Sequence, residues 1–134
     1  MSDSERQVIF YEPEGRPSGQ IEGRLSCKFL LVFDEQCLFL LFGPPTQFPY
    51  HAYLLDRFCS DRQIPSSWVK QPDLVEVHAP HIHVRGGGWM EVDFGSKTVR
   101  LEGQSRAYGD YDREELVALV ENHPFFDGYE WSVE

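Results

Sequence analysis

The sequence predicts an α+β fold in which one mixed β-sheet lies between two α-helices. The length of 134 residues suits a single domain. Apolar residues make up 41% of the chain and aromatic residues 14%, which is enough for a packed core and too much for a disordered chain. Short apolar or alternating segments and two segments with helical spacing follow one another as β-β-α-β-β-β-α-β.

The N-terminal third of the chain divides into an arm and a strand hairpin. Residues 1–24 are rich in Gly, Pro and Glu, so we expect an N-terminal arm with a short strand at Val8–Tyr11. Residues 25–134 then form a single domain. It opens with the apolar segments CKFLLVF (27–33) and CLFLLF (37–42), which predict a hairpin of central strands covered on both faces.

A helix is expected from Thr46 to about Arg62. Gly43-Pro44-Pro45 ends the preceding strand, and Pro49 suits a first helical turn. Tyr50, Leu54 and Phe58 recur at helical spacing. The segment from Ile64 to Ser67 breaks this helix.

Three strands are expected in the middle of the chain. The segment LVEVHA (74–79) alternates, and a change of apolar parity after it predicts a β-bulge at Ala79–His81. The triple glycine Gly86–Gly88 leads into WMEVDF (89–94), which forms a hairpin with KTVRLE (97–102) around the two-residue turn Gly95-Ser96. The inward side chains are Met90, Val92, Phe94, Val99 and Leu101.

The C-terminal part predicts a loop, a helix and a last strand. The loop runs from Gly103 to Asp112. Asp112 and Glu115 form a capping box for a helix that ends near Asn122. The expected buried stripe of this helix is Leu116, Val117 and Val120, and a strand follows at Tyr129–Val133.

Charge and composition exclude several functions. The chain holds 12 basic and 22 acidic residues, a net charge of −10, and residues 110–134 account for −7 with eight acids and one base. No basic stripe is present to neutralise phosphates, so we expect no nucleic-acid partner. No apolar run approaches the roughly 20 residues that span a bilayer, and no secretory signal is visible. We therefore expect a cytoplasmic protein without a membrane partner, with Cys27, Cys37 and Cys59 as reduced thiols.

Two features point to anion chemistry. His51 falls in the first turn of the expected helix, where free N–H groups favour an anion and a neutral imidazole that can act as a base. The loop around Arg106 carries the small residues Ser105, Ala107 and Gly109, whose backbone N–H groups could cradle an anion while Arg106 adds charge. Each feature also has a structural interpretation, as a half-buried histidine over a helix end and as an ordinary strand-to-helix turn.

Short motifs in a consistent order resemble the janus/ocnus family of phosphohistidine phosphatases. They cover about residues 27–133: Cys27–Val32 as the family's first strand, Tyr50-His51-Ala52 with Asp56 as its helix, Gly86–Gly88 as its triple-glycine strand, Ser105–Gly109 as its S-x-A-Y-G loop, and Tyr129–Val133 as its terminal strand. The resemblance implies a sheet between two helices and metal-independent hydrolysis of a phosphorus–nitrogen bond, with no cofactor. The implied partner is a phosphorylated protein or a small anionic phosphoramidate.

The resemblance also implies roles for single residues. His51 is the catalytic residue, as base for water or as phosphoryl acceptor, and Lys28 holds the phosphoryl oxygens. Backbone amides at Ser105 and Ala107 complete the pocket. Two family arginines are replaced, one by Trp89 and one near Phe42-Gly43, where no base is present. Arg85, Arg100 and Arg106 are the candidate substitutes, and Tyr50 and Trp89 give the pocket an aromatic rim.

Two other functions fit the same residues. A non-catalytic protein of this fold could keep the phosphate cradle after losing turnover with its arginines. A metal-dependent enzyme could instead use His81 and His83 with Glu91 or Asp93, because two histidines and one carboxylate can bind zinc or iron. The spacing of His83 and Glu91 is longer than known signatures of this kind allow, so we expect no metal site.

Overall fold

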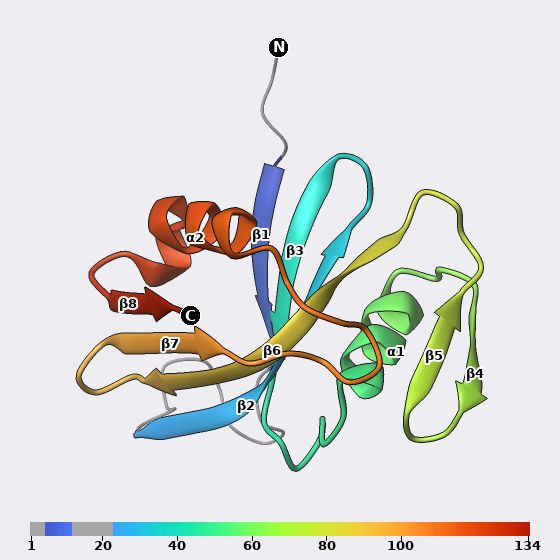
Figure 1. Ribbon diagram of the computed structural model, residues 1–134, viewed down its shortest axis with the longest axis horizontal. Helices are drawn as coiled ribbons and strands as arrows, with labels where there is room; N and C mark the ends of the chain where they lie inside the picture. Colours follow the sequence, from blue (N-terminus) through green and yellow to red (C-terminus); the bar gives the residue numbers. More distant parts are fainter. Residues whose placement is uncertain (1–4, 12–22) are drawn as a thin grey trace.

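The computed structural model describes residues 5–11 and 23–134. A strongly curled sheet of six strands carries one helix on each face, and a small two-stranded hairpin flanks the first helix (Figure 1). The α+β class is therefore confirmed. Neither helix of the described chain has the length and apolar character that a membrane crossing requires.

The main sheet is mixed, with the strand order β1-β3-β2-β6-β7-β8. β1 is parallel to β3 and β8 is parallel to β7, whereas the central pairs are antiparallel. The elements are β1 (Glu5–Phe10), β2 (Arg24–Phe33), β3 (Cys37–Phe42), α1 (His51–Asp61), β4 (Ser66–Lys70), β5 (Leu74–Val77), β6 (His83–Asp93), β7 (Thr98–Glu102), α2 (Arg113–Asn122), the 3₁₀ helix η1 (Pro124–Phe126) and β8 (Glu130–Val133).

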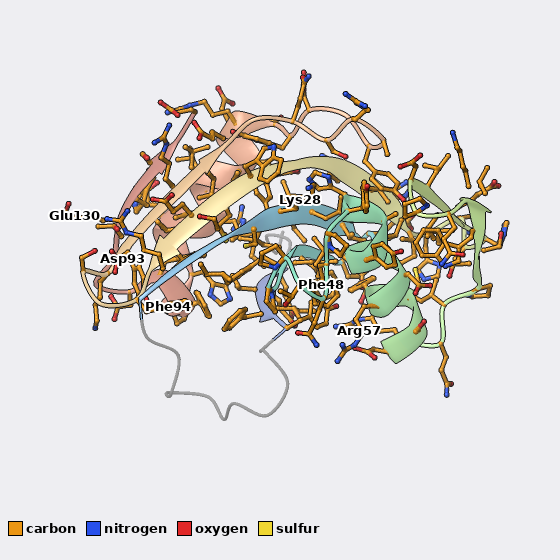
Figure 2. The ribbon with its side chains drawn as sticks, turned by 90° about the horizontal axis from the view of Figure 1, so that it is seen from below. Lys28, Phe48, Arg57, Asp93, Phe94 and Glu130 are labelled. Carbon is orange, nitrogen blue, oxygen red and sulfur yellow. The ribbon has the colours of Figure 1, made fainter. Side chains whose placement is uncertain are left out.

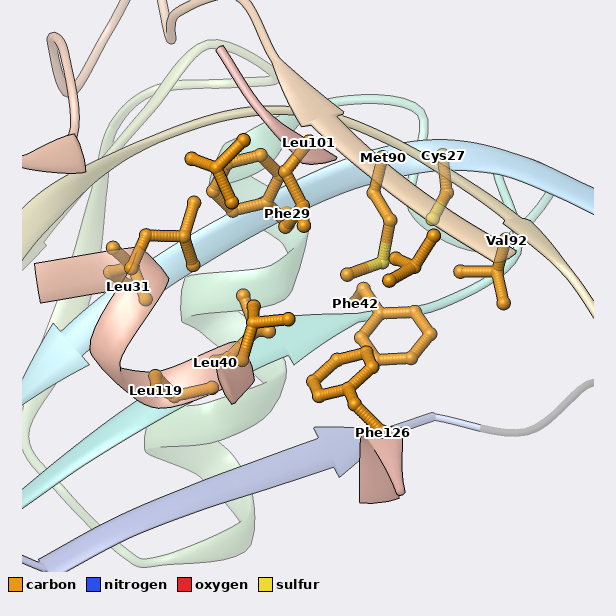
Figure 3. Packing of buried hydrophobic residues seen from close by; sticks show 14 of the residues in the cluster. Cys27, Phe29, Leu31, Leu40, Phe42, Met90, Val92, Leu101, Leu119 and Phe126 are labelled. Carbon is orange, nitrogen blue, oxygen red and sulfur yellow. The ribbon is translucent and has the colours of Figure 1, made fainter. Parts of the chain in front are cut away.

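Two hydrophobic cores lie on the two faces of the sheet. Because side chains alternate along a strand, β2 sends Phe29 and Leu31 toward α2 and sends Leu30 and Val32 toward α1. Figure 3 shows the core beneath α2, where Phe29, Met90 and Leu101 pack together with residues of α2 and η1. The predicted hairpin of buried central strands, β2 and β3, is confirmed.

Part of the predicted N-terminal arm belongs to the sheet. Residues 5–10 pair in register with residues 37–42, so the strand begins before the expected Val8–Tyr11 segment and ends at Phe10. Tyr11 continues into the core beside Phe48, with ring centroids 5.2 Å apart. Residues 12–22 of the arm lie outside the described residues.

The first helix begins five residues later than expected. Gln47 and Phe48 both donate their N–H groups to the carbonyl oxygen of Pro44, which closes a separate turn before the helix. Tyr50 is the extended N-cap residue, so His51 is the first helical residue. The expected start at Thr46, with Pro49 in the first turn, is wrong.

The middle of the chain needs three corrections. Strand β4 was not expected, and it pairs with β5 in a separate hairpin. The proposed bulge at Ala79–His81 is instead a break between β5 and β6. The triple glycine lies inside β6 rather than before it, and the β6–β7 turn spans residues 94–97 rather than Gly95-Ser96 alone.

The N-terminus of α2 is capped as expected, but by half of the capping box. The Asp112 side chain accepts hydrogen bonds from the N–H groups of Glu114 and Glu115, at 2.9 and 3.2 Å. The Glu115 carboxylate does not return to Asp112, because it pairs with Arg85 at 2.8 Å. The buried stripe contains Leu119 with Leu116 and Val120, whereas the expected Val117 is only partly buried.

Candidate functional site

His51 stands at the N-terminus of α1 and is buried against β6. Its side chain lies under the sheet face that α1 covers, and the residue is 7% exposed. Its Nε2 atom lies 3.0 Å from the carbonyl oxygen of Gly88. Because a carbonyl oxygen only accepts, Nε2 carries the proton and Nδ1 is the basic nitrogen of the neutral ring. The expected position at the start of the helix is confirmed. The residue is buried more deeply than the half-buried histidine of the structural interpretation.

The surroundings of His51 hold its ring neutral. Burial lowers the pKa of His51 below its ordinary value, and the positive charge of Lys28 lowers it further. The hydrogen bond to Gly88 acts in the opposite direction, because the carbonyl oxygen stabilises the protonated ring. At neutral pH the site therefore offers a basic nitrogen rather than an imidazolium.

Lys28 lies on the same face of the sheet as His51. Even-numbered residues of this part of β2 face α1, and Figure 2 shows Lys28 on β2 beside that helix. Its Nζ atom is 4.1 Å from the centroid of the Trp89 ring and 5.8 Å from that of Tyr50. Burial lowers the pKa of the Lys28 amine. The structure thus brings together Lys28, His51 and both rim residues predicted from the sequence.

The rim residues are unusual in their exposure. Trp89 is 50% exposed and Tyr50 is 45% exposed, although both are large aromatic side chains. They contact the Lys28 amine from β6 and from the helix N-cap. Exposed aromatic side chains around a cation provide a surface for a ligand rather than a buried core.

The triple glycine makes room for His51. A Cβ atom at Gly87 would lie 2.4 Å from the carbonyl oxygen of Phe29 and 2.9 Å from Cδ2 of His51. Both contacts are too short for a real side chain, so the imidazole packs directly on the β6 backbone. These glycines stand out as a motif in the sequence, but only the structure shows that they make room for the His51 ring.

Hydrogen bonds hold the loop from Gly103 to Asp112 beside the triple glycine. Ser105 and Gly109 exchange two backbone hydrogen bonds, and the Gly109 carbonyl oxygen accepts one from Gly87 at 3.3 Å. The Tyr108 hydroxyl bonds to the backbone N–H and carbonyl oxygen of Val75 in β5. The loop therefore crosses from β7 to the α1 face, as Figure 1 shows. No sequence pattern indicated that Tyr108 holds this loop in place.

The other predicted loop residues are placed differently. Ser105 is buried, and its hydroxyl accepts a hydrogen bond from the Tyr108 N–H at 3.0 Å. Arg106 and Ala107 are exposed, and neither forms a hydrogen bond or ion pair with the described residues. The hydroxyl of Ser105 is thus a loop-shaping group, while Arg106 remains a solvent-facing cation.

The candidate substitutes for the missing arginines are engaged elsewhere. Arg85 pairs with Glu115 of α2 at 2.8 Å. Arg100 pairs with Glu102 at 2.7 Å and with Glu134 at 3.5 Å. Lys28 is consequently the cation that contacts both rim aromatics without an ion-pair partner among the described residues.

The ligand set considered for a metal is not assembled. His83 bonds to Glu35 at 3.2 Å, and His81 lies in the turn before β6. Glu91 follows His83 by eight residues of one strand, which is a separation of about 26 Å. Across residues 5–11 and 23–134, no three metal-ligating side chains gather at one point.

The surface of the described chain includes two shallow hollows. One of about 190 Å³ lies on the sheet beside Trp89, between Ser26, Glu91, Arg100 and Glu102. A larger one of about 400 Å³ lies between the end of α2, η1 and β8, and none of the predicted site residues lines it. The smaller hollow therefore adjoins the candidate site.

The sequence matches no protein-family model and no curated protein. The resemblance to the janus/ocnus family stays a prediction from short motifs. The case for the site consequently depends on the geometry of His51, Lys28 and the triple glycine.

Proposed function

We propose that the protein is a small metal-independent phosphohydrolase that cleaves the phosphorus–nitrogen bond of a phosphoramidate such as phosphohistidine. The observation that carries this proposal is the pairing of a buried, neutral His51 with the Lys28 ammonium on one face of the sheet. A phosphoryl group needs positioning and positive charge more than covalent chemistry, and these two residues supply a base and a cation. The resemblance to phosphohistidine phosphatases supports the same conclusion.

His51 acts through Nδ1 in this proposal. As a base, Nδ1 takes a proton from water while the water oxygen forms a bond to phosphorus, and the phosphorus–nitrogen bond breaks as the leaving nitrogen becomes protonated. As a phosphoryl acceptor, Nδ1 itself bonds to phosphorus while the phosphorus–nitrogen bond of the substrate breaks and the leaving nitrogen takes a proton from solvent. Water then attacks phosphorus, the bond to Nδ1 breaks, and phosphate is released. In both routes the Gly88 carbonyl stabilises the positive charge that develops on the ring.

Lys28 and the N-terminus of α1 bind the phosphoryl oxygens. The first helical turn presents backbone N–H groups, and Tyr50 makes no side-chain cap that would occupy them. The backbone amide of Ala107 and the side chain of Arg106 are further proposed contacts. The expected amide of Ser105 is not available, because it donates to the Gly109 carbonyl oxygen at 3.1 Å. We place such a protein in the cytoplasm, with a phosphorylated protein or a small phosphoramidate as its substrate.

One observation favours a second function, the binding of a phospho-ligand without turnover. Arg85 and Arg100 are held in ion pairs, so the site keeps one well-placed cation where several would stabilise a transition state. A cradle with one cation and a neutral histidine is sufficient for binding.

Phosphate release from a phosphohistidine peptide separates these functions. We expect release by the purified protein, with the same rate in the presence of a chelator. His51→Gln should lower release by at least about 10²-fold, whereas the control His78→Gln beside the exposed hairpin should not. Tight binding of the peptide without release would favour the binding protein, and loss of release in chelator would favour a metal enzyme.

A further inference from the structure

The sheet face beyond α1 carries ordered rows of side chains. Cross-strand pairing sets Lys28, Trp89 and Glu102 in one row on β2, β6 and β7. The next row outward contains Ser26, Glu91 and Arg100, and a third contains Arg24, Asp93 and Thr98. Residues of these rows face away from the core beneath α2, because their neighbours along each strand fill that core.

Two charged residues of this face, Lys28 and Glu91, take no part in its ion pairs. Arg24 pairs with Asp93 at 3.2 Å, and Arg100 pairs with Glu102 at 2.7 Å. Lys28 and Glu91 have no ion-pair partner among the described residues. They lie on neighbouring rows, which are about 7 Å apart along a strand. The face therefore presents one positive charge beside His51 and one negative charge farther out.

Trp89 is a neighbour of both charges, because it pairs with Lys28 across the strands and precedes Glu91 by two residues on β6. Its ring contacts the Lys28 amine, and it also lines the hollow of about 190 Å³ that contains Glu91. A hollow with an aromatic wall and an unpaired carboxylate suits a cationic side chain, by charge attraction and by contact with the indole. Arg100 in the same lining is paired with Glu102, so Glu91 leaves the hollow with a net negative charge that disfavours a second phosphoryl group.

We propose that the hollow between Trp89 and Glu91 is a subsite for a lysine or arginine side chain of the substrate, which is a phosphorylated polypeptide with a basic residue near its phosphoryl group. This inference depends on the proposed function, because the phosphoryl group occupies the His51–Lys28 site. The charge of the whole chain agrees with it. The net charge of −10, with Glu134 bonded to Arg100 at the border of this face, attracts a basic polypeptide.

Two peptides that carry a non-hydrolysable phosphonate analogue of phosphohistidine test the subsite. One has lysine on both sides of the analogue and the other has glutamine. We expect the full chain to bind the lysine peptide about 3- to 10-fold more tightly, as one ion pair and one cation–π contact imply. The preference should decrease between 50 and 300 mM salt, because added ions screen these charges.

Single carboxylate variants test whether Glu91 causes the preference for the lysine peptide. Glu91→Gln should lose the ion-pair part of the preference for the lysine peptide and keep only what the Trp89 contact supplies, while its affinity for inorganic phosphate should not decrease. The matched control Glu76→Gln, an exposed carboxylate on the β5 hairpin, should keep the preference. Equal binding of both peptides by the unmodified protein would overturn the subsite, and so would an undiminished preference in Glu91→Gln.

The outcomes distinguish this inference from the proposed hydrolysis. A lysine preference that depends on Glu91, without hydrolysis of the corresponding phosphohistidine peptide, would support the subsite and refute the hydrolase. Hydrolysis of the lysine and glutamine peptides with equal affinity and equal rate would support the hydrolase and refute the subsite. Failure of both analogue peptides to bind would refute both.

Discussion

The Nε2 atom of His51 donates a hydrogen bond to the carbonyl oxygen of Gly88, 3.0 Å away. This bond ties the first residue of α1 to the middle of the longest strand of the main sheet, across 37 positions of sequence. It fixes the tautomer of the ring, so Nδ1 is the nitrogen that can act as a base or nucleophile. One side chain thus serves both the packing of the helix on the sheet and the proposed chemistry, so its variants must separate the two roles.

His51→Gln should lose turnover and keep most of the stability. The glutamine amide nitrogen can replace Nε2 as the donor to Gly88, but it has no basic nitrogen in place of Nδ1. We expect phosphate release to fall by at least about 10²–10⁴-fold. We expect the free energy of unfolding to change by less than about 1 kcal/mol.

His51→Ala is the matched comparison. It removes the hydrogen bond that the ring donates to the buried Gly88 carbonyl, which should cost about 1–3 kcal/mol. Urea unfolding of the two variants measures this difference. Equal stability of the two would show that the hydrogen bond contributes nothing, and full activity of His51→Gln would refute the proposed base.

Stability should fall as the pH decreases below the ordinary histidine pKa. Burial lowers the pKa of His51 in the folded protein, so the unfolded chain binds a proton more readily. The free energy of unfolding therefore rises with pH between the folded pKa and about 6.5, and the stabilisation is lost as pH falls through the folded pKa. Urea unfolding at pH 5 to 8 measures the slope.

His123 needs its own control in this experiment. Burial lowers its pKa as well, so it contributes a slope of the same sign. Subtraction of the His51→Gln profile from that of the unmodified protein isolates the His51 contribution, and His123→Gln serves as the matched variant. Identical slopes for the unmodified protein and His51→Gln would contradict the lowered pKa.

The parts of the fold that depend on local pattern could be predicted from sequence. The continuous apolar segments of β2 and β3 identified a buried hairpin, and Asp112 identified the start of α2. The start of α1 could not be predicted in this way. The sequence before His51 is compatible with a first helical turn at Pro49, and only the turn closed by Pro44 places the start at His51.

Long-range contacts limited the prediction of the site. His51 and Lys28 could be proposed as partners through the family resemblance, and the structure places them on one sheet face. The contact with the Gly88 carbonyl had no local signal. A triple glycine was expected to precede a strand, because glycine has no side chain to pack in a sheet. The glycines lie inside β6 instead, where the His51 ring packs too closely on Gly87 for any side chain.

Gly87→Ala should destabilise the protein and disturb the site together. The added methyl group would lie 2.4 Å from the Phe29 carbonyl oxygen and 2.9 Å from the His51 ring, so the strand or the ring must move. We expect a loss of about 1–3 kcal/mol, as overpacking of a core costs, together with reduced turnover. Thermal unfolding and phosphate release measure the two effects.

Gly95→Ala is the control for this variant. Its nearest neighbour would be an Asp93 oxygen at 3.4 Å, an ordinary contact, and its φ lies outside the positive range. We expect a change within about 0.5 kcal/mol. Equal stability of the two alanine variants would contradict the close packing of the imidazole on β6.

Lys28→Met should raise the pKa of His51 and weaken phosphate binding in the same variant. The positive charge of Lys28 lowers the pKa of the imidazole, and methionine keeps a similar length without the charge. The imidazole should then titrate closer to its ordinary value, although burial still holds it below that value. Inorganic phosphate should bind less tightly, because the ammonium beside Trp89 and Tyr50 is one of its proposed contacts. An NMR titration of the His51 ring protons follows the first effect and calorimetry follows the second.

The control is Lys70→Met, whose ammonium lies 3.9 Å from Asp73 on the exposed hairpin and should affect neither measurement. A His51 pKa that is the same in Lys28→Met and in the unmodified protein would show that the two residues do not share one site.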